Sequence, residues 1–155
     1  MLQKVKMMIA SLILGATLLA CTPEQVAYFQ TLTPEKQTEV QHTISLSAGV
    51  CADAPSQSNC NLAWIMALLD GYTINDFACL DYIIMHESGW MNVPNAAGGR
   101  AYGIPQALPG SKMASHGADW HDNPRTQIAW LLDYVDGRYG TACKAKSFKA
   151  ARGWY

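Results

Sequence analysis

The sequence predicts a mainly α-helical domain that follows an export signal and a tether. Three observations predict this class. Apolar residues recur at helical spacing in segments that begin at capping residues and end at glycine. A long stretch rich in glycine and proline, residues 92–123, separates two of these segments and is expected to be loop. The chain has 155 residues, 50% of them apolar, which is enough for one domain with its own core.

Residues 1–20 are predicted to be a signal peptide. Two lysines precede an apolar run of fourteen residues, 7–20, whereas a membrane-spanning helix needs about 20. The sequence Leu18-Leu19-Ala20-Cys21 resembles a bacterial lipobox, in which Cys21 would be acylated. We therefore expect an exported lipoprotein that is anchored to the membrane through Cys21. The alternative is an ordinary signal peptide and a protein secreted to the cell wall.

Four further cysteines, an even number behind an export signal, predict two disulfides in an oxidising compartment. Three connectivities are possible, and we favour Cys51–Cys60 together with Cys79–Cys143. The second pair closes the longer loop, so we expect it to contribute more to stability. A zinc site is the alternative, but no C-x-x-C spacing is present, and we expect no metal.

Residues 21–60 are predicted to form a polar tether with short helical segments. Thr22-Pro23 and Thr33-Pro34 are typical helix starts, with threonine as the N-cap and proline at the first helical position. Small polar residues from Ser47 to Asn61 indicate a loop. The compact domain is therefore expected to span residues 61–155.

This domain should contain three helices. A short buried helix is expected at residues 64–69. A second begins at Thr73, with Asp76 in a capping-box arrangement, and ends by Gly89. A third begins after Asn123, has apolar residues at i, i+3, i+4 and i+7, and ends at Gly140. Residues 141–155 are expected to be a tail.

Composition excludes several classes of function. Charged residues make up only 15% of the chain and the net charge is −1, so no basic surface for nucleic acid is expected. The pair His86-Glu87 does not extend to H-E-x-x-H, because Trp90 stands where the second histidine would be. No G-x-S-x-G is present. We expect neither a metal nor an organic cofactor.

Glu87 is the candidate catalytic residue. It follows an apolar helical stretch, and Ile83, Ile84 and Trp90 are expected to form apolar walls around it, which would favour a protonated carboxyl. A glycine-bearing turn with an uncharged polar residue, 101–106, comes later in the chain. One acid without an evident carboxylate partner suggests cleavage of a sugar chain by a single general acid/base.

Three blocks of sequence resemble lysozyme-like lytic transglycosylases. Glu87-Ser88 resembles the Glu-Ser signature of that family, and Tyr102-Gly103-Ile104-Pro105-Gln106 resembles its Gly-Leu-Met-Gln loop. Asn123-Pro124, Gln127-Ile128 and Tyr134-Val135 are similar to its Asn-Pro-x-x-Asn-Ile helix with a later Tyr-Leu. Residues 101–113 and the terminal Gly-Trp-Tyr are similar to small exported transglycosylase-like domains of actinobacteria and their phages. A location in a phage virion is therefore also compatible with the sequence.

The resemblance implies an α+β lysozyme-like fold in which the long loop forms one side of a glycan cleft. It implies cleavage of the β-1,4 bond between MurNAc and GlcNAc in a peptidoglycan strand, with Glu87 as the single acid/base and a 1,6-anhydro product. The substrate-binding residues that it implies are Ser88, Tyr102, Gly103, Gln106 and Tyr134.

Two alternatives remain open. If Asp119 or Asp122 faced Glu87, a lysozyme-type muramidase that activates water would be possible. A non-catalytic peptidoglycan-binding module that kept the cleft is the other.

Overall fold

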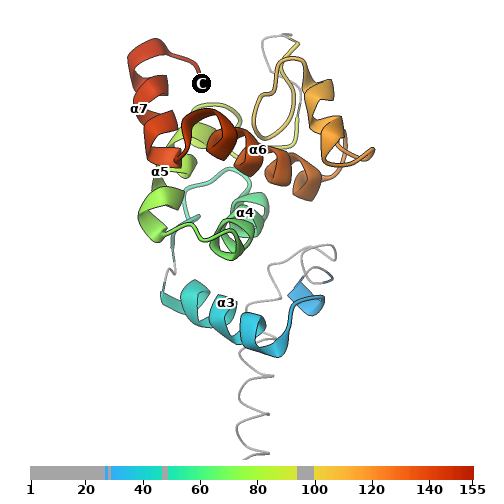
Figure 1. Ribbon diagram of the computed structural model, residues 1–155, viewed down its shortest axis with the longest axis vertical. Helices are drawn as coiled ribbons and strands as arrows, with labels where there is room; N and C mark the ends of the chain where they lie inside the picture. The colour runs from blue at the N-terminus through green and yellow to red at the C-terminus, as the bar shows by residue number, and fades with distance from the viewer. Residues whose placement is uncertain (1–26, 28, 47–48, 94–99) are drawn as a thin grey trace, which may run out of the picture. The chain divides into compact units, whose positions relative to one another are not determined.

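The computed structural model describes residue 27 and residues 29–46, 49–93 and 100–155 (Figure 1). The expected signal peptide, Cys21 and the first helix start lie outside the described residues. The chain divides into two compact units, residues 1–48 and 49–155. No helix in the described part is long and apolar enough to span a bilayer.

The first unit contains α3 (Pro34–Leu46), which begins at the proline where a helix start was predicted. The Thr33 hydroxyl accepts a hydrogen bond from the Lys36 amide at 3.4 Å. Gln37 Nε2 donates to the carbonyls of Phe29 and Leu32, at 3.1 and 3.0 Å. These bonds fix the turn that precedes the helix.

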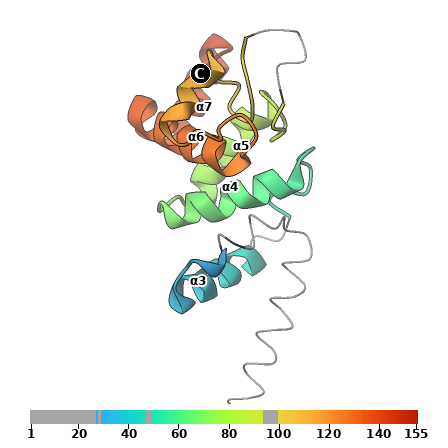
Figure 2. The same cartoon turned by 90° about the vertical axis from the view of Figure 1, so that its right-hand side faces the viewer.

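The second unit is built from helices (Figure 2). They are α4 (Gln57–Leu69), α5 (Ile74–Met85), the short 3-10 helix η1 (Gly110–Ser115), α6 (Pro124–Tyr139) and α7 (Ala142–Arg152). The β pairing in the described residues is a single antiparallel bridge between Tyr102 and Ala107. The prediction of a mainly α domain is therefore confirmed.

Helix α5 packs mainly against α7, and α4 packs against α6. The helix starts follow the predicted capping chemistry: Thr73 and Asp76 form a reciprocal capping box, and the Asn123 side chain accepts from the Arg125 amide at 2.9 Å. The core includes buried apolar side chains from α4, α5 and α6, among them Trp64, Phe77, Leu80, Ile83, Ile128, Leu131 and Val135.

Two stretches differ from the prediction. Residues 49–60 belong to the compact unit rather than to a tether, and α4 begins at Gln57, inside the expected loop. Burial of Cys51 and Cys60, joined by a disulfide, packs this segment onto the domain. The expected tail instead forms α7, capped by Thr141 and ended by Gly153 at φ +78°. Its buried residues are Ala142, Ala145 and Lys149, a stripe of two small side chains and one lysine rather than of large apolar residues, and such a stripe is hard to recognise in a sequence.

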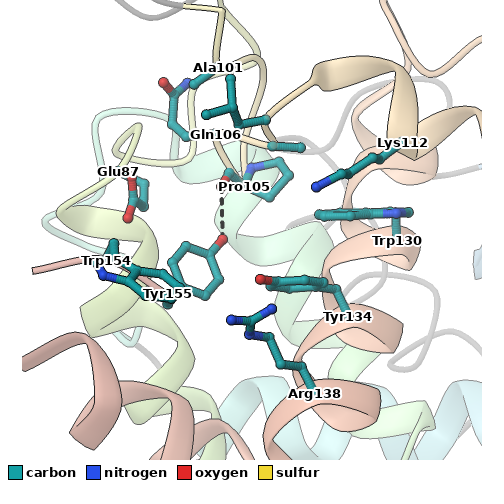
Figure 3. Close-up of a pocket in the computed structure, with 12 residues that line it drawn as sticks. Glu87, Ala101, Pro105, Gln106, Lys112, Trp130, Tyr134, Arg138, Trp154 and Tyr155 are labelled. Carbon is teal, nitrogen blue, oxygen red and sulfur yellow. Dashed lines mark hydrogen bonds between the residues drawn. The ribbon is translucent and has the colours of Figure 1, made fainter. Parts of the chain in front are cut away.

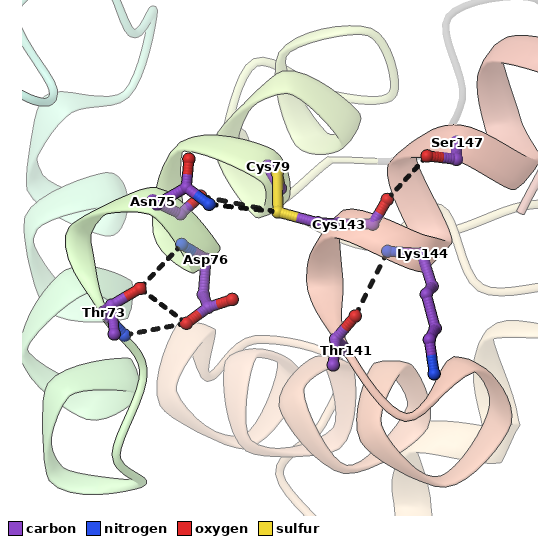
Figure 4. Close-up of a disulfide and its surroundings, with 8 residues drawn as sticks. All are labelled: Thr73, Asn75, Asp76, Cys79, Thr141, Cys143, Lys144 and Ser147. Carbon is purple, nitrogen blue, oxygen red and sulfur yellow. Dashed lines mark hydrogen bonds between the residues drawn. A yellow bond between two sulfur atoms is a disulfide. The ribbon is translucent and has the colours of Figure 1, made fainter.

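The disulfides are Cys51–Cys60 and Cys79–Cys143, the two pairs that we favoured among three connectivities. Figure 4 shows the second one joining α5 to α7, beside the capping box at the start of α5. It links residues 64 positions apart and holds the two helices close, with a Cα–Cα distance of 4.9 Å. This cross-link determines which side chains of α7 can reach the end of α5.

Candidate functional site

Glu87 lies just past the end of α5, at the start of a tightly held turn. After it the backbone takes positive φ at Gly89 (60°) and at Trp90 (67°). The Trp90 side chain is fully buried, and its Nε1 donates to Asp81 Oδ1 at 2.7 Å. The Trp90 carbonyl accepts from Asn59 Nδ2 at 2.9 Å. Because these contacts hold an unfavourable backbone conformation in place, the backbone next to Glu87 is held in a fixed position.

The carboxylate of Glu87 is ion-paired. Its Oε1 accepts a hydrogen bond from Nζ of Lys149, and the two side chains are 20% and 9% exposed. The expectation of apolar walls is wrong: Ile83, Ile84 and Trp90 are buried in the core, and none of them lines the pocket that Glu87 faces. The reason is that Ile83 and Ile84 in α5, and Trp90 in the turn after it, point into the core, whereas Glu87 pairs with Lys149 of α7.

Glu87 borders a pocket of about 420 Å³ (Figure 3). The pocket has four aromatic residues in its lining, Trp130, Tyr134, Trp154 and Tyr155, and two cationic ones, Lys112 and Arg138. Figure 3 shows Glu87 on one side, with Trp130 and Tyr134 on the other. A concave site with aromatic walls and a few polar groups is typical of a small-molecule or glycan site.

One face of α6 supplies the far wall. Trp130, Tyr134 and Arg138 are four residues apart and therefore lie in one row along the helix. The Trp130 and Tyr134 rings stack, with centroids 4.9 Å apart and 12° between their planes. This repeat at i, i+4 and i+8 was visible in the sequence, where only Tyr134 was singled out.

The C-terminal residue Tyr155 connects the wall to the 101–106 loop. Its hydroxyl donates to the Pro105 carbonyl at 2.8 Å, and its ring centroid is 5.9 Å from that of Tyr134. Burial raises the pKa of the Tyr155 phenol well above its usual value, and the negative charge of Glu87 adds to this shift. Tyr155 is therefore a neutral phenol beside the carboxylate.

The predicted loop contributes Ala101, Pro105 and Gln106 to the pocket lining, and Gln106 is the polar side chain among them. The Gln106 Nε2 donates to the Gly103 carbonyl at 2.8 Å. Gly103 itself is a turn residue at φ +73°, where an added Cβ would lie 2.4 Å from Gln127 Oε1. Glycine is therefore required here for backbone shape and close packing.

Ser88 and Gln127 hold this loop from two sides. Ser88 Oγ donates to the Ile104 carbonyl at 2.7 Å, and the Ile104 amide donates to Gln127 Oε1 at 2.9 Å. The Tyr102 hydroxyl donates to the His121 carbonyl at 3.1 Å. Of the predicted site residues, Glu87, Gln106 and Tyr134 line the pocket, whereas Ser88, Tyr102 and Gly103 do not.

The two candidate partner carboxylates lie elsewhere. Asp119 accepts from Asn123 Nδ2 and Thr126 Oγ1, both at 2.7 Å, and these bonds lower the pKa of Asp119. Asp122 contacts His121 at 2.8 Å. Neither lines the pocket, and within the described part of the chain Glu87 is the sole acidic residue that does.

The aromatic and cationic residues of the lining other than Tyr134 were not predicted as site residues: Lys112, Trp130, Arg138, Trp154 and Tyr155. Lys149, which pairs with Glu87, was not predicted either. The terminal Trp154-Tyr155 pair was noted only as part of a tail. Because α7 was not expected, no feature of the sequence connected Lys149 to Glu87.

The chain matches no protein-family model, no curated protein and no solved structure. The geometry of the pocket therefore carries the functional interpretation.

Proposed function

We propose that this chain has a lysozyme-like domain that cleaves the β-1,4 MurNAc–GlcNAc bond of peptidoglycan by lytic transglycosylation. The observation that carries the proposal is the single carboxylate, Glu87, in a pocket with aromatic walls. Glycoside hydrolases generally use two carboxyl groups that flank the scissile bond. A lytic transglycosylase needs one, because the C6 hydroxyl of the muramic sugar acts as the nucleophile.

The proposed reaction uses Glu87 twice. As a neutral acid it protonates the bridging oxygen while the bond from that oxygen to C1 breaks. As a carboxylate it then takes the proton of the C6 hydroxyl, whose oxygen bonds to C1. The products are a 1,6-anhydro sugar and a free hydroxyl on the leaving sugar, with Glu87 again protonated.

The remaining pocket residues have matching roles in binding. The stacked Trp130 and Tyr134 rings offer flat apolar surfaces to sugar faces. The Gln106 side-chain oxygen is the group of that amide that can accept from an N-acetyl N–H, since its nitrogen is engaged by Gly103. Ser88 and Gln127 act through the backbone of the loop.

The Lys149 ion pair favours a second candidate, a non-catalytic peptidoglycan-binding module. The Lys149 ammonium engages Glu87 Oε1, so this oxygen is not free to meet the bridging oxygen of a glycan. Catalysis therefore requires that Glu87 leaves Lys149 when glycan binds.

Product analysis separates the candidates. The disulfide-bonded protein is incubated with purified peptidoglycan, and the soluble fragments are identified by mass. Transglycosylation gives 1,6-anhydro ends that are absent with Glu87→Gln. Reducing ends instead would indicate a muramidase, and sedimentation with the wall without any fragments would indicate a binding module.

An exported location fits this substrate, and the disulfides are consistent with an oxidising compartment. We propose anchoring through acylated Cys21. Palmitate labelling of the wild type that is lost in Cys21→Ser would support the anchor, and equal labelling of both would refute it.

A further inference from the structure

We infer that the pocket selects glycans whose muramic sugar carries a carboxylate, and that Arg138 and Lys112 bind this group. The inference rests on the proposed function, because it specifies the form of peptidoglycan that the same site takes. The ligand chemistry is a carboxylate, from either the lactyl ether of the sugar or the peptide attached to it.

Arg138 is a pre-oriented cation. Its guanidinium carbon lies 5.8, 5.4 and 5.5 Å from the ring centroids of Tyr134, Tyr139 and Trp154. Its Nε donates to the Tyr139 hydroxyl at 3.0 Å. Three rings and one hydrogen bond restrict the side chain, so less conformational entropy is lost when the terminal nitrogens bind a carboxylate. No carboxylate of the described residues forms an ion pair with it.

Lys112 is the second cation of the lining. It belongs to η1, and in the described structure it too has no carboxylate at ion-pair distance. In Figure 3 Lys112 is drawn at one end of the Trp130–Tyr134 stack and Arg138 at the other. A sugar on the stacked rings would therefore have a cation near each end.

The charge balance of the pocket points to an anionic ligand. Among the described residues, the sole acidic residue of the lining is Glu87, and Lys149 already pairs with it, so Lys112 and Arg138 add net positive charge to the pocket. N-acetylglucosamine is neutral and offers no partner for these cations. Muramic sugars carry a carboxylate on the lactyl group, or on the stem peptide when the lactyl group is amidated. Charge-assisted bonds of this kind are roughly twice as strong as neutral ones.

Binding of three glycans of equal length tests the inference. The neutral probe is a chitooligosaccharide, the second is a peptidoglycan strand stripped of peptides, and the third keeps its stem peptides. Glu87→Gln with Lys149→Gln is the background, because it removes the acid and keeps the net charge of the pocket. Near-UV circular dichroism checks its fold, and titrations of the wild-type chain provide a second background.

We expect at least one carboxylate-bearing glycan to bind about tenfold more tightly than the chitooligosaccharide. This ratio of affinities, carboxylate-bearing glycan to chitooligosaccharide, should fall as the salt concentration is raised. Arg138→Gln and Lys112→Gln should each lower the ratio, and together bring it close to one. Lys144→Gln is the control, because it removes the same charge from α7 outside the pocket lining and should leave the ratio unchanged. The tighter of the two carboxylate-bearing strands identifies the source of the group.

Equal affinity for all three glycans, or a ratio that survives loss of both cations, would overturn the inference. Its failure is distinguishable from failure of the proposed cleavage. Anhydro products together with a ratio near one would refute the carboxylate site alone. A high ratio that needs Arg138 and Lys112, without any cleavage, would refute the enzyme and support the site.

Discussion

Glu87 and Lys149 form an ion pair that joins the end of α5 to α7. The Lys149 side chain is only 9% exposed, and Glu87 is the one group with which its ammonium forms an ion pair in the described structure. The Cys79–Cys143 disulfide ties the same two helices. The proposed acid is therefore held by a cation that the fold itself brings to it.

A double-mutant cycle should show that the Glu87–Lys149 ion pair contributes to the free energy of unfolding. Glu87→Ala leaves a nearly buried ammonium without its partner, and we expect a loss of about 1–3 kcal/mol in the free energy of unfolding. The loss is smaller than for a fully buried pair, because one side of this pair faces an open pocket. Lys149→Met should lose less. The double variant should be more stable than the sum of single losses predicts, with a coupling energy of about 1 kcal/mol. Urea unfolding measures all four proteins, and strict additivity would argue against the pair in solution.

Lys149→Met should cleave peptidoglycan faster than the wild type, by about tenfold. The reason is that the Lys149 ammonium occupies Glu87 Oε1, and its removal leaves both carboxyl oxygens free to reach the bridging oxygen of the glycan. The rate of release of anhydro fragments is the measurement. Lys144→Met, an exposed lysine of the same helix, is the matched control and should leave the rate unchanged. A folded Lys149→Met protein that cleaves more slowly would instead show that the ammonium positions the acid.

Loss of the Cys79–Cys143 disulfide should destabilise the protein more than loss of Cys51–Cys60. The two bonds span 64 and 9 residues, and loop-closure entropy predicts losses of about 4 and about 2.5 kcal/mol. Paired Cys→Ser variants compared by thermal unfolding give this order. Cys79→Ser/Cys143→Ser should also weaken the coupling between Glu87 and Lys149, which the short-loop variant should preserve. The reverse order of stability would contradict the prediction.

Capping residues explain how much of the fold could be predicted from sequence. Thr73, Asn123 and Gly140 determine where helices start or stop through local hydrogen bonds and backbone preference, and such signals need no tertiary context. Helix α7 has the same kind of signals in Thr141 and Gly153, but it was not predicted, because the segment between them has few large apolar residues. Its contact with α5 is made by small residues and one lysine, whose burial depends on tertiary packing.

The same reason limits prediction of the site. Glu87, Gln106 and Tyr134 could be placed at the pocket because each belongs to a local pattern. The partner of Glu87 lies 62 residues away, in a segment whose structure depends on tertiary packing. Lys149 in a polar stretch therefore looked like an ordinary solvated side chain.

Asp81 should make stability fall as pH rises. Burial raises the pKa of its carboxyl above the usual value, an effect larger than the opposing hydrogen bond from Trp90. In the unfolded chain the Asp81 carboxyl ionises at about pH 4. Between that pH and the higher folded-state pKa the native protein binds more protons, so this contribution is lost as pH rises. Asp81→Asn keeps an acceptor for Trp90 and removes the charge.

The stability of Asp81→Asn relative to wild type should therefore increase from about pH 4 upward and then level off. For a half-buried carboxyl we expect a gain of about 0.5 kcal/mol after solvent screening. Urea unfolding at a series of pH values checks this, and a difference that does not change with pH would contradict it.

Two glycine-to-alanine substitutions should have opposite effects on stability. At Gly103 the backbone is left-handed, and a Cβ would lie 2.4 Å from Gln127 Oε1. Gly103→Ala should displace Gln127 from the Ile104 amide and cost about 3 kcal/mol. Gly137 lies within α6, has nothing within 4 Å of an added Cβ and has no positive φ. Gly137→Ala should stabilise by about 0.5–1 kcal/mol, because alanine is the better helix former.

Denaturant midpoints of the two variants and the wild type give the comparison. Glycan affinity adds a second readout: Gly103→Ala should weaken binding, because Gln106 is carried by the same turn, whereas Gly137→Ala should not change it. Similar stability of all three proteins would mean that the loop does not need glycine at residue 103. In that case the hydrogen bond from the Ile104 amide to Gln127 would not be needed to hold the turn that presents Gln106 to the pocket.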